Sequence, residues 1–272
     1  MRFLYVAPRY HTNQVPIIRG LKRKGHEVCF LSQYAGKVED YSDLTPTVIG
    51  YSRIFLFFDR IYVALMKNRD AYAGDRKMKC GFPPIGKLKR AIRDSHGDVA
   101  ILRERSVYSI FAYLLCKKYK IPAILYNQSP LWEDCIKNDP AHRLMRLLTP
   151  TVRMTPVMGV QDGRKVKEPG AAFVPFVMEP EQKAAEKRWI KDGITHIFSI
   201  GKYEERKNHR MLVEIVEELS AVSNIHLTIA GERTTSAHQA YYDRLAAYIA
   251  DHGLQDKVTL LVNLNRQQVA EQ

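Results

Sequence analysis

The sequence predicts an α/β protein made of two doubly wound units, each with a parallel sheet. Short apolar runs alternate with helix-length amphipathic segments, and strand, helix and strand follow one another within about 30 residues. A proline-containing stretch, 170–180, interrupts this alternation, which then begins again. The chain has 272 residues, of which 46% are hydrophobic and 26% charged, so it can bury a sizeable core.

The first unit is expected to alternate strands with helices. Val15, Ile18 and Leu21 recur at near-helical spacing after an apolar strand, and Gly25 then ends the helix. The later runs DVAILRE and IPAILYNQ have the apolar character of strands in a parallel sheet, with a helix between them. The expected strands are 3–8, 27–32, 98–104, 121–128 and 153–160, and the expected helices are 14–24, 52–69, 87–95 and 107–119.

Two aromatic and basic stretches of this unit allow more than one interpretation. Segment 52–69 is an amphipathic helix whose apolar stripe either packs in the core, which we favour, or faces a membrane. That stripe consists of Ile54, Phe58, Ile61 and Leu65. Segment 76–93 is rich in Lys and Arg, and we expect it to form a basic surface that can pair with anionic lipid head groups.

The second unit repeats the alternation after the connector. Its expected strands are 196–201, 225–231 and 258–264, and its expected helices are 208–220, 237–251 and one that begins at Asn265. The predicted division is therefore a first domain over 1–178 and a second domain over 179–272.

Charge is divided unevenly between the two parts. Residues 1–178 contain 30 Lys and Arg against 15 Asp and Glu, a balance of +15, whereas residues 179–272 contain 12 against 14, a balance of −2. A basic first part suggests an anionic partner, although a solvated basic face without a partner is the alternative. Nucleic acid is not expected as that partner, because no helix-turn-helix, RNA-binding or zinc signature occurs.

Several classes of protein are disfavoured by simple patterns. No apolar run approaches the roughly 18 residues of a membrane span, and the first residues lack the features of a signal peptide. Cys29, Cys80, Cys116 and Cys135 have no metal-like spacing, so we expect reduced and mostly buried thiols. The sequence therefore predicts a cytoplasmic protein, with peripheral attachment to the inner face of the cell membrane as an open possibility.

The turn FSIGKYEERKN, residues 198–208, is the clearest candidate for a binding site. An apolar strand ends at Gly201, a turn with five charged residues follows, and a helix begins at Asn208. Backbone N–H groups and the helix dipole favour an anion at such a place, and Lys202, Arg206 and Lys207 would add positive charge. A solvated charged loop is the alternative. Gly231 and Glu232 end the next strand, where glycine permits a close backbone approach.

A second group of polar residues ends strands of the first unit. His11 and Asn13 follow the first strand, Arg103 and Glu104 end another, and Gln128 ends a third. Ligands of parallel sheets bind at this carboxyl edge, so we expect these residues to contact an acceptor molecule. For His11 a plain surface position is equally compatible, and Arg103 and Glu104 could instead form a surface ion pair.

The order of segments resembles a known family. The segments MRFLYVAPRYHTNQVPIIRGLKRKGHEV, DVAILRERSVYSIFAYLLCKKYKIPAILYNQ, FVPFVMEP, IFSIGKYEERKN, HLTIAGE and KVTLLVNLNRQQVAE follow one another as in glycosyltransferases of the GT-B fold. They are most similar to the retaining "group 1" enzymes of family 4. The resemblance covers most of the chain and implies two Rossmann-like domains, the first for the acceptor and the second for a nucleotide-diphosphate sugar.

The resemblance implies roles for individual residues. Lys202 and Lys207 would neutralise the diphosphate leaving group without a metal ion or other cofactor. His11 would position the acceptor or, in an inverting enzyme, act as the base. The donor would contact Gly201, Lys202, Arg206, Lys207, Asn208, Gly231 and Glu232, and the acceptor would contact His11, Asn13, Arg103, Glu104 and Gln128.

The sequence also departs from the family pattern. Lys202 stands where an arginine is usual, the common Gly-Gly turn after the first strand is absent, and Asn127-Gln128 stands where many members carry histidine. The two glutamates of the later donor loop have no counterpart before Gln272. Only 94 residues follow residue 178, against about 150 in an ordinary domain, so we expect an incomplete second domain, which leaves catalytic competence open.

The predicted function is transfer of a sugar from a nucleotide sugar to a saccharide or lipid-linked acceptor, with retention, in cell-surface polysaccharide or lipopolysaccharide assembly. An inverting transferase or a sugar-nucleotide epimerase remains an alternative within the same fold. A module without catalysis that binds an anionic surface through the basic first domain is the alternative from another class.

Overall fold

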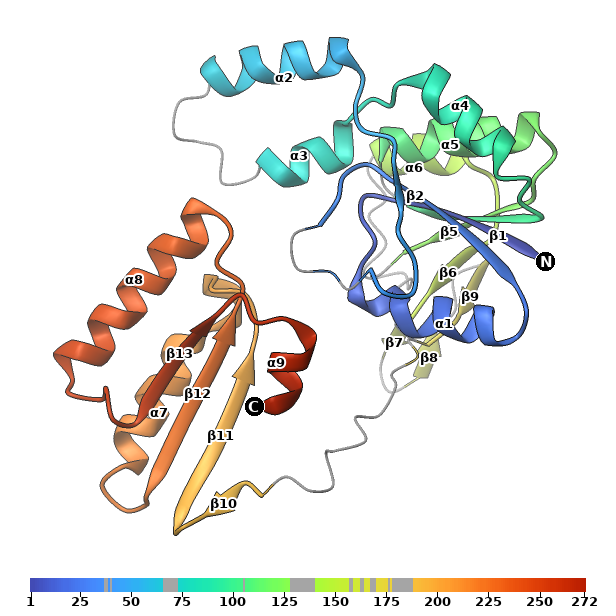
Figure 1. Ribbon diagram of the computed structural model, residues 1–272. Coiled ribbons are helices and arrows are strands. Elements are labelled where there is room, and N and C mark those ends of the chain that lie inside the picture. The colour runs from blue at the N-terminus through green and yellow to red at the C-terminus, as the bar shows by residue number, and fades with distance from the viewer. Residues whose placement is uncertain are drawn as a thin grey trace. The chain divides into compact units, whose positions relative to one another are not determined.

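The computed structural model divides the chain into two compact units, Met1–Glu179 and Pro180–Gln272. Each unit has its own sheet and its own hydrophobic core (Figure 1). The functions assigned to the two predicted domains remain predictions. The structure describes residues 1–36, 39, 41–65, 73–104, 106–127, 140–156, 159–161, 164–166, 170–175, 177 and 188–272.

The first unit contains a seven-stranded sheet in which every pair of neighbours is parallel. The strand order is β3-β2-β1-β4-β5-β6-β9, so the direction of winding reverses between β1 and β4. Ligands bind at such a switch point in doubly wound folds. The strands are β1 (Arg2–Ala7), β2 (Glu27–Ser32), β3 (Thr47–Val48), β4 (Val99–Arg103), β5 (Ala123–Tyr126), β6 (Arg153–Thr155) and β9 (Ala171–Phe173).

Helices cover both faces of this sheet, with α1 on the opposite side from α4 and α5 (Figure 1). Alternation along β1 explains the two layers, because Leu4 and Val6 join one core cluster while Tyr5 and Ala7 join the other. The helical segments are η1 (Thr12–Gln14), α1 (Val15–Arg23), α2 (Arg53–Leu65), α3 (Ala73–Cys80), α4 (Ile85–Asp94), α5 (Val107–Lys118) and α6 (Pro140–Leu148). A separate antiparallel pair joins β7 (Gly159–Gln161) to β8 (Arg164–Val166).

The second unit contains a four-stranded sheet in the order β10-β11-β12-β13. Strands β11, β12 and β13 are parallel, and β10 is antiparallel to β11. Its core joins the buried faces of α7 and α8 to β12, and includes Val213, Leu227 and Leu245. The elements are β10 (Ile190–Lys191), β11 (Ile194–Ile200), η4 (Glu205–Lys207), α7 (His209–Leu219), β12 (Ile225–Gly231), α8 (Ser236–Asp251), β13 (Val258–Val262) and α9 (Arg266–Glu271).

The predicted fold class is confirmed, and most element bounds differ from the prediction by one or two residues. Other differences are larger. The stretch 170–180 was expected to be a connector, but Ala171–Phe173 forms the edge strand β9, paired with β6. Helices α3 and α6, the short strands β3 and β10 and the antiparallel pair of β7 and β8 were not predicted. Among the described cysteines, Cys116 is buried and Cys29 partly buried, but Cys80 is exposed, so the expectation of mostly buried thiols holds only in part.

The expectation that helix α2 packs its apolar stripe in the core is wrong. Ile54, Phe58, Ile61 and Leu65 are 72%, 62%, 42% and 78% exposed, whereas the charged Asp59 is buried. The sequence shows that the helix is amphipathic but cannot show which face turns inward. No helix of the described residues has the length and apolar character needed to cross a membrane.

A small polar network joins the carboxyl ends of β4 and β5 to β6. It consists of an ion pair between Glu104 and Arg153 and a hydrogen bond from the Asn127 amide. Glu104 accepts hydrogen bonds from Arg153 Nε and from Asn127 Nδ2, each at 2.8 Å. The side chains of Glu104 and Arg153 are only 10% and 11% exposed. Arg153 also donates to the carbonyl oxygens of Thr149 and Thr151. The network fixes the strand ends at the edge where the switch point lies.

Because the pair is nearly buried, Glu104→Ala should lower the free energy of unfolding by about 3 kcal/mol, as the substitution leaves the Arg153 charge without its carboxylate. Urea unfolding followed by circular dichroism measures the change. The double variant Glu104→Ala, Arg153→Ala should be less destabilised than the sum of the two single variants. A loss below ~1 kcal/mol in the single variant would show instead the behaviour of a solvated surface pair.

Candidate functional site

The turn between β11 and α7 lies at the carboxyl edge of the second sheet. Backbone hydrogen bonds fix both of its sides: Gly201 N donates to Ala230 O at 3.0 Å, and Tyr203 N donates to Glu232 O at 3.2 Å. The segment after β13 joins the same edge, since Asn263 N donates to Gly231 O at 2.9 Å. The ends of β11, β12 and β13 are therefore hydrogen-bonded together, and the charged turn lies on the surface at this edge of the sheet.

Tyr203 is the anchor of the turn. Its side chain is fully buried among the core residues of the second unit, although both of its neighbours in the chain are charged. The hydroxyl group lies 2.8 Å from the carbonyl oxygen of Leu261 and 3.0 Å from that of Ile229. Burial raises the pKa of this phenol, so the hydroxyl remains a proton donor. The backbone of the turn cannot leave the sheet without breaking these contacts.

Gly231 is required by the close packing of this anchor. A Cβ atom at position 231 would stand 2.4 Å from Cε2 of Tyr203 and 2.8 Å from the carbonyl oxygen of Gly201. The prediction that this glycine permits a close approach is thus explained by the chain itself, because the Tyr203 ring occupies the space. Gly201 has a similar but looser environment, with Lys207 and His209 3.2–3.4 Å from a Cβ placed there.

His209 joins the start of α7 to the turn. The side chain is 1% exposed, and its Nε2 lies 3.0 Å from the carbonyl oxygen of Lys202. A carbonyl oxygen only accepts, so Nε2 carries the proton in this contact. Burial lowers the pKa of His209, more than its hydrogen bonds to the backbone of Lys202 and Gly201 raise it. The imidazole is therefore neutral, and it supports the charged turn through its hydrogen bond to the Lys202 carbonyl.

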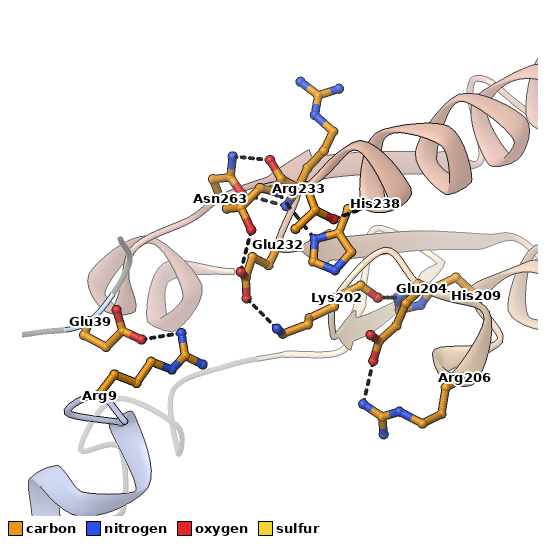
Figure 2. A network of polar contacts seen from close by, with 12 residues as sticks. Arg9, Glu39, Lys202, Glu204, Arg206, His209, Glu232, Arg233, His238 and Asn263 are labelled. Atoms are coloured by element: carbon orange, nitrogen blue, oxygen red, sulfur yellow. Dashed lines mark hydrogen bonds and ion pairs between the residues drawn. The ribbon is translucent and has the colours of Figure 1, made fainter. Parts of the chain in front are cut away.

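Lys202 and Arg206 point in different directions (Figure 2). Lys202 Nζ lies 3.5 Å from Glu232 Oε2, and its side chain is 40% exposed. Arg206 is 74% exposed and turns to Glu204, at 2.5 Å. Lys207 is exposed, and no carboxylate pairs with it in the part of the chain that the structure describes. Lys202 and Lys207 are thus the cations most available to a ligand.

The start of α7 is left open toward the same surface. Asn208 precedes it in the left-handed conformation, with φ 49° and ψ 42°, and its side chain makes no capping hydrogen bond. The N–H of Arg210 already reaches the Tyr241 hydroxyl at 3.3 Å. In the described residues no protein acceptor engages the first-turn N–H groups of His209 and Met211. A free helix N-terminus beside two lysines provides the donors and the field that stabilise a phosphate.

The first unit holds the predicted residues His11 and Asn13 just after β1. His11 N donates to Gln14 Oε1 at 2.9 Å, and His11 Nδ1 accepts from the Asn13 N–H at 3.2 Å. Because Nδ1 is used as an acceptor, the neutral ring carries its proton on Nε2. In this geometry His11 is better suited to donate a hydrogen bond than to act as a general base.

The other predicted residues of the first unit lie at the ends of β4 and β5. Glu104 is committed to the network with Arg153 and Asn127. The guanidinium of Arg103 lies over the Tyr126 ring, 5.3 Å from its centroid. Gln128 lies outside the described residues. The sheet therefore brings the ends of β1, β4 and β5 to one edge, as predicted, but their contact with an acceptor stays a prediction.

The described residues contain no group of three or more His, Cys, Asp or Glu side chains that could hold a metal ion. Metal-independent chemistry remains a prediction on this evidence. The positive charge at the site comes from the lysines and from the helix terminus.

Comparison with protein families identifies the second unit. Residues 181–272 match the family described as Glycosyl transferases group 1, and this segment begins one residue after the second compact unit does. The second unit is therefore similar to the group 1 glycosyl transferases. The charged turn, Tyr203 and His209 all lie inside the matched segment. No curated protein matches the chain.

Solved structures show that the whole chain has the GT-B fold of glycosyltransferases. The chain is similar to a glycosyltransferase from Rickettsia africae, with a TM-score of 0.61 at 14% identity over 99% of this chain and 69% of the other. It is also similar to Anabaena Alr3699/HepE in complex with UDP and glucose, with a TM-score of 0.58 at 11% identity, over 100% and 71%. A third is an α,α-trehalose 6-phosphate synthase from Burkholderia multivorans, with a TM-score of 0.57 at 11% identity, over 98% and 73%.

The family match of the second unit and the GT-B fold of the whole chain support a glycosyltransferase. Two structural residues of its candidate site escaped prediction from sequence. Tyr203 lies inside the turn and His209 directly follows it as the first residue of α7. An aromatic residue within a run of charges was the available signal, since such a residue in a short turn often packs against the sheet below.

The packing around Gly231 predicts a large effect for a single methyl group. Gly231→Ala should lower the free energy of unfolding by about 2 kcal/mol, because the Tyr203 ring has no space into which to move. Gly253→Ala is not a suitable comparison, since that glycine has a positive φ of 65°. Gly86→Ala in α4, where nothing lies within 4 Å, should be neutral or stabilising. Equal effects of both substitutions on the urea midpoint would contradict the packing account.

The environment of His209 predicts a pH dependence of stability. Its pKa is lower in the folded state, so the unfolded chain takes up the proton first as the pH falls. The free energy of unfolding should therefore decrease as the pH is lowered through about 6.5, the ordinary histidine value. Urea midpoints at pH 7.5 and 5.5 should differ more for the natural chain than for His209→Gln. An identical difference in both chains would mean that His209 titrates as it does in water.

Proposed function

We propose that this glycosyltransferase binds the diphosphate of a nucleotide sugar on the turn 201–208 and transfers the sugar to an acceptor held by the first unit. The observation that carries the proposal is the turn itself. Backbone hydrogen bonds and the Tyr203 side chain fix it to the neighbouring strands. It exposes Lys202 and Lys207, and it leads into an uncapped helix. It also lies inside the segment that matches the group 1 family.

The chemistry needs stabilisation of a leaving group. The bond between the anomeric carbon and a phosphate oxygen breaks, and negative charge develops on the diphosphate. Cations and N–H groups that are already in place stabilise that charge, and one such donor contributes about 3 kcal/mol in the transition state. Lys202, Lys207 and the N–H groups of His209 and Met211 would play this role. The remaining proposed donor contacts are Gly201, Arg206, Asn208, Gly231 and Glu232.

Arg206 and Glu232 would have to adjust when the donor binds. Arg206 is paired with Glu204, and Glu232 holds Lys202 at 3.5 Å. A diphosphate would compete with Glu232 for Lys202, because both are anions. We propose that Glu232 holds Lys202 in place before the nucleotide sugar binds. Once the nucleotide sugar is bound, Glu232 would accept hydrogen bonds from its sugar hydroxyl groups.

The acceptor is proposed to bind at the carboxyl edge of the first sheet. His11, Asn13, Arg103, Glu104 and Gln128 are the proposed contacts, with His11 as a hydrogen-bond donor to the acceptor or to the leaving phosphate. Retention of configuration fits this role better than inversion, because inversion and epimerisation both require a base.

We also propose that the enzyme is cytoplasmic and attached to the inner face of the membrane. The net charge of +15 over residues 1–178 supports this location. A saccharide or lipid-linked acceptor in cell-surface polysaccharide or lipopolysaccharide assembly would suit such a location.

Calorimetric titration with UDP and GDP tests the donor site. The natural chain should bind one of the two nucleotides, and Lys202→Ala, Lys207→Ala should weaken binding about a hundredfold, or ~3 kcal/mol, because two charge-assisted contacts are lost. UDP is a reasonable first probe, since the Anabaena structure holds UDP and glucose.

A matched control changes the same charge elsewhere in the unit. Arg188→Ala, Lys191→Ala removes two exposed cations that precede β11, at the opposite end of that strand from the turn. This variant should keep the nucleotide affinity of the natural chain within about twofold. Equal weakening by both double variants would show a response to net charge alone. Tight binding that neither variant alters would place the diphosphate away from this turn and contradict the proposal.

A further inference from the structure

Helix α2 has the reverse of the usual arrangement of a surface helix in a globular protein. Such a helix buries its apolar stripe and exposes its charges. In α2 the apolar residues lie outside and an acidic residue lies inside. Phe57 and Phe58 are 60% and 62% exposed, while Asp59 is 5% exposed. Exposed apolar groups of this size on one helix are a marker of an interaction surface.

The inward face of α2 is held by an ion-pair cluster with α3. Asp59 contacts Arg76 Nη1 at 2.5 Å and Lys77 Nζ at 3.0 Å. The same guanidinium lies 4.1 Å from the centroid of the Tyr62 ring. Asp59 and Tyr62 lie on the same turn of α2, and their contacts join α2 to α3. They fix the rotation of α2 about its axis, and that rotation turns the opposite face outward.

The outward face is a continuous apolar stripe. Each member lies three or four residues from another member, which places them on one side of the helix. Their exposed fractions run from 42% to 78%. This apolar face of α2 consists of Ile54, Phe57, Phe58, Ile61 and Leu65.

Exposed basic residues lie on α2 itself and on the two helices that follow it. Arg53 and Arg60 lie on the same helix and are exposed. The following helices add more exposed cations, and α3 is the helix to which α2 is bound. These further cations are Lys79 in α3 and Lys87, Lys89 and Arg90 in α4. A partner for this surface must accept apolar side chains and offer negative charge.

We propose that the apolar face of α2 inserts into the surface of an anionic lipid bilayer, with the helix lying in the plane of the interface. Interfacial helices combine aromatic and aliphatic residues on one side with Lys and Arg at the margin. Anionic head groups satisfy the cations while the acyl region receives Phe57 and Phe58. A second copy of the chain fits less well, because a symmetric contact would bring the same cations of both copies together.

The inference goes beyond the donor site, since it rests on α2, α3 and α4 and on no residue of the turn 201–208. It gives the proposed peripheral attachment a defined contact surface. The predicted membrane role of the basic stretch 76–93 becomes a supporting one, in which cations attract the bilayer and the apolar face of α2 retains it. A bilayer at this position would hold the enzyme beside lipid-linked acceptors.

Vesicle flotation with the full chain tests the proposal. The chain should float with vesicles of phosphatidylcholine and 30% phosphatidylglycerol, and about tenfold less with phosphatidylcholine alone. Phe57→Ser, Phe58→Ser, Ile61→Ser should reduce the fraction bound to anionic vesicles at least tenfold, because three large apolar side chains no longer enter the interface. The control Ile190→Ser, Val222→Ser removes two exposed apolar residues of the second unit and should bind as the natural chain does.

A direct depth measurement separates insertion from simple charge attraction. In a chain in which Phe replaces Trp132 and Trp189, the single tryptophan of Phe58→Trp should be quenched by lipids that carry bromine on the acyl chain near the head group. The quenching should exceed that of the natural chain, whose tryptophans are Trp132 and Trp189. Absence of this quenching in a chain that floats would show adsorption by charge alone and would overturn the insertion of α2. A lipid-free dimer in sedimentation velocity that dissociates in the triple serine variant would assign the face to a second copy and also overturn the proposal.

Measuring nucleotide binding by the triple serine variant tests the donor site and the membrane surface independently. The triple serine variant leaves the turn 201–208 unchanged, so its affinity for UDP or GDP should equal that of the natural chain. A chain that binds nucleotide but not vesicles would refute the membrane surface alone. A chain that floats with vesicles but ignores both nucleotides would refute the donor site alone.

Discussion

The burial of Tyr203 beneath Gly231 is the contact on which the candidate donor site depends. The ring lies where a side chain at position 231 would stand, and the hydroxyl reaches the backbone of two strands. This anchor places a run of charged residues at the carboxyl edge of the sheet, where solvent would otherwise let it move freely. His209 then carries the constraint into α7, because its ring joins the first residue of the helix to the carbonyl of Lys202. Because the buried imidazole is neutral, it can make this contact near Lys202 and Lys207 without adding a positive charge to theirs.

The two units differ in how their charged residues are arranged. The second unit has almost balanced charge and supplies local cations at one turn, whereas the first has a large excess of Lys and Arg spread over several helices. Locally fixed cations suit a small, highly charged ligand, because the field of a few nearby groups dominates. A spread of exposed cations suits an extended anionic surface instead, since each contributes little by itself. Helix α2 adds apolar groups to that surface because the ion pairs of Asp59 with Arg76 and Lys77 turn the opposite, apolar face outward.

Much of the fold could be predicted from the sequence, since alternating apolar runs and helical periodicity record the burial of strands and helix faces. The strand 225–231 matches β12, and Asn265 caps α9 as its position suggested. The orientation of α2 could not be predicted, because periodicity shows two faces without showing which one meets the protein. Tyr203 and His209 were missed for a related reason. The role of Tyr203 comes from contacts with Ile229, Gly231 and Leu261, which lie far along the chain. The role of His209 comes from its burial and from its contact with the Lys202 carbonyl, which no sequence pattern records.

The central claim is that the anchored turn 201–208 holds a diphosphate. A crystal structure of the chain with bound UDP tests it most directly. The account predicts density for the β-phosphate within hydrogen-bond distance of Lys202 Nζ or Lys207 Nζ and of the N–H groups that open α7, with Tyr203 in place under Gly231. Density for UDP elsewhere, with Lys202 still paired to Glu232 and no phosphate at the start of α7, would contradict it.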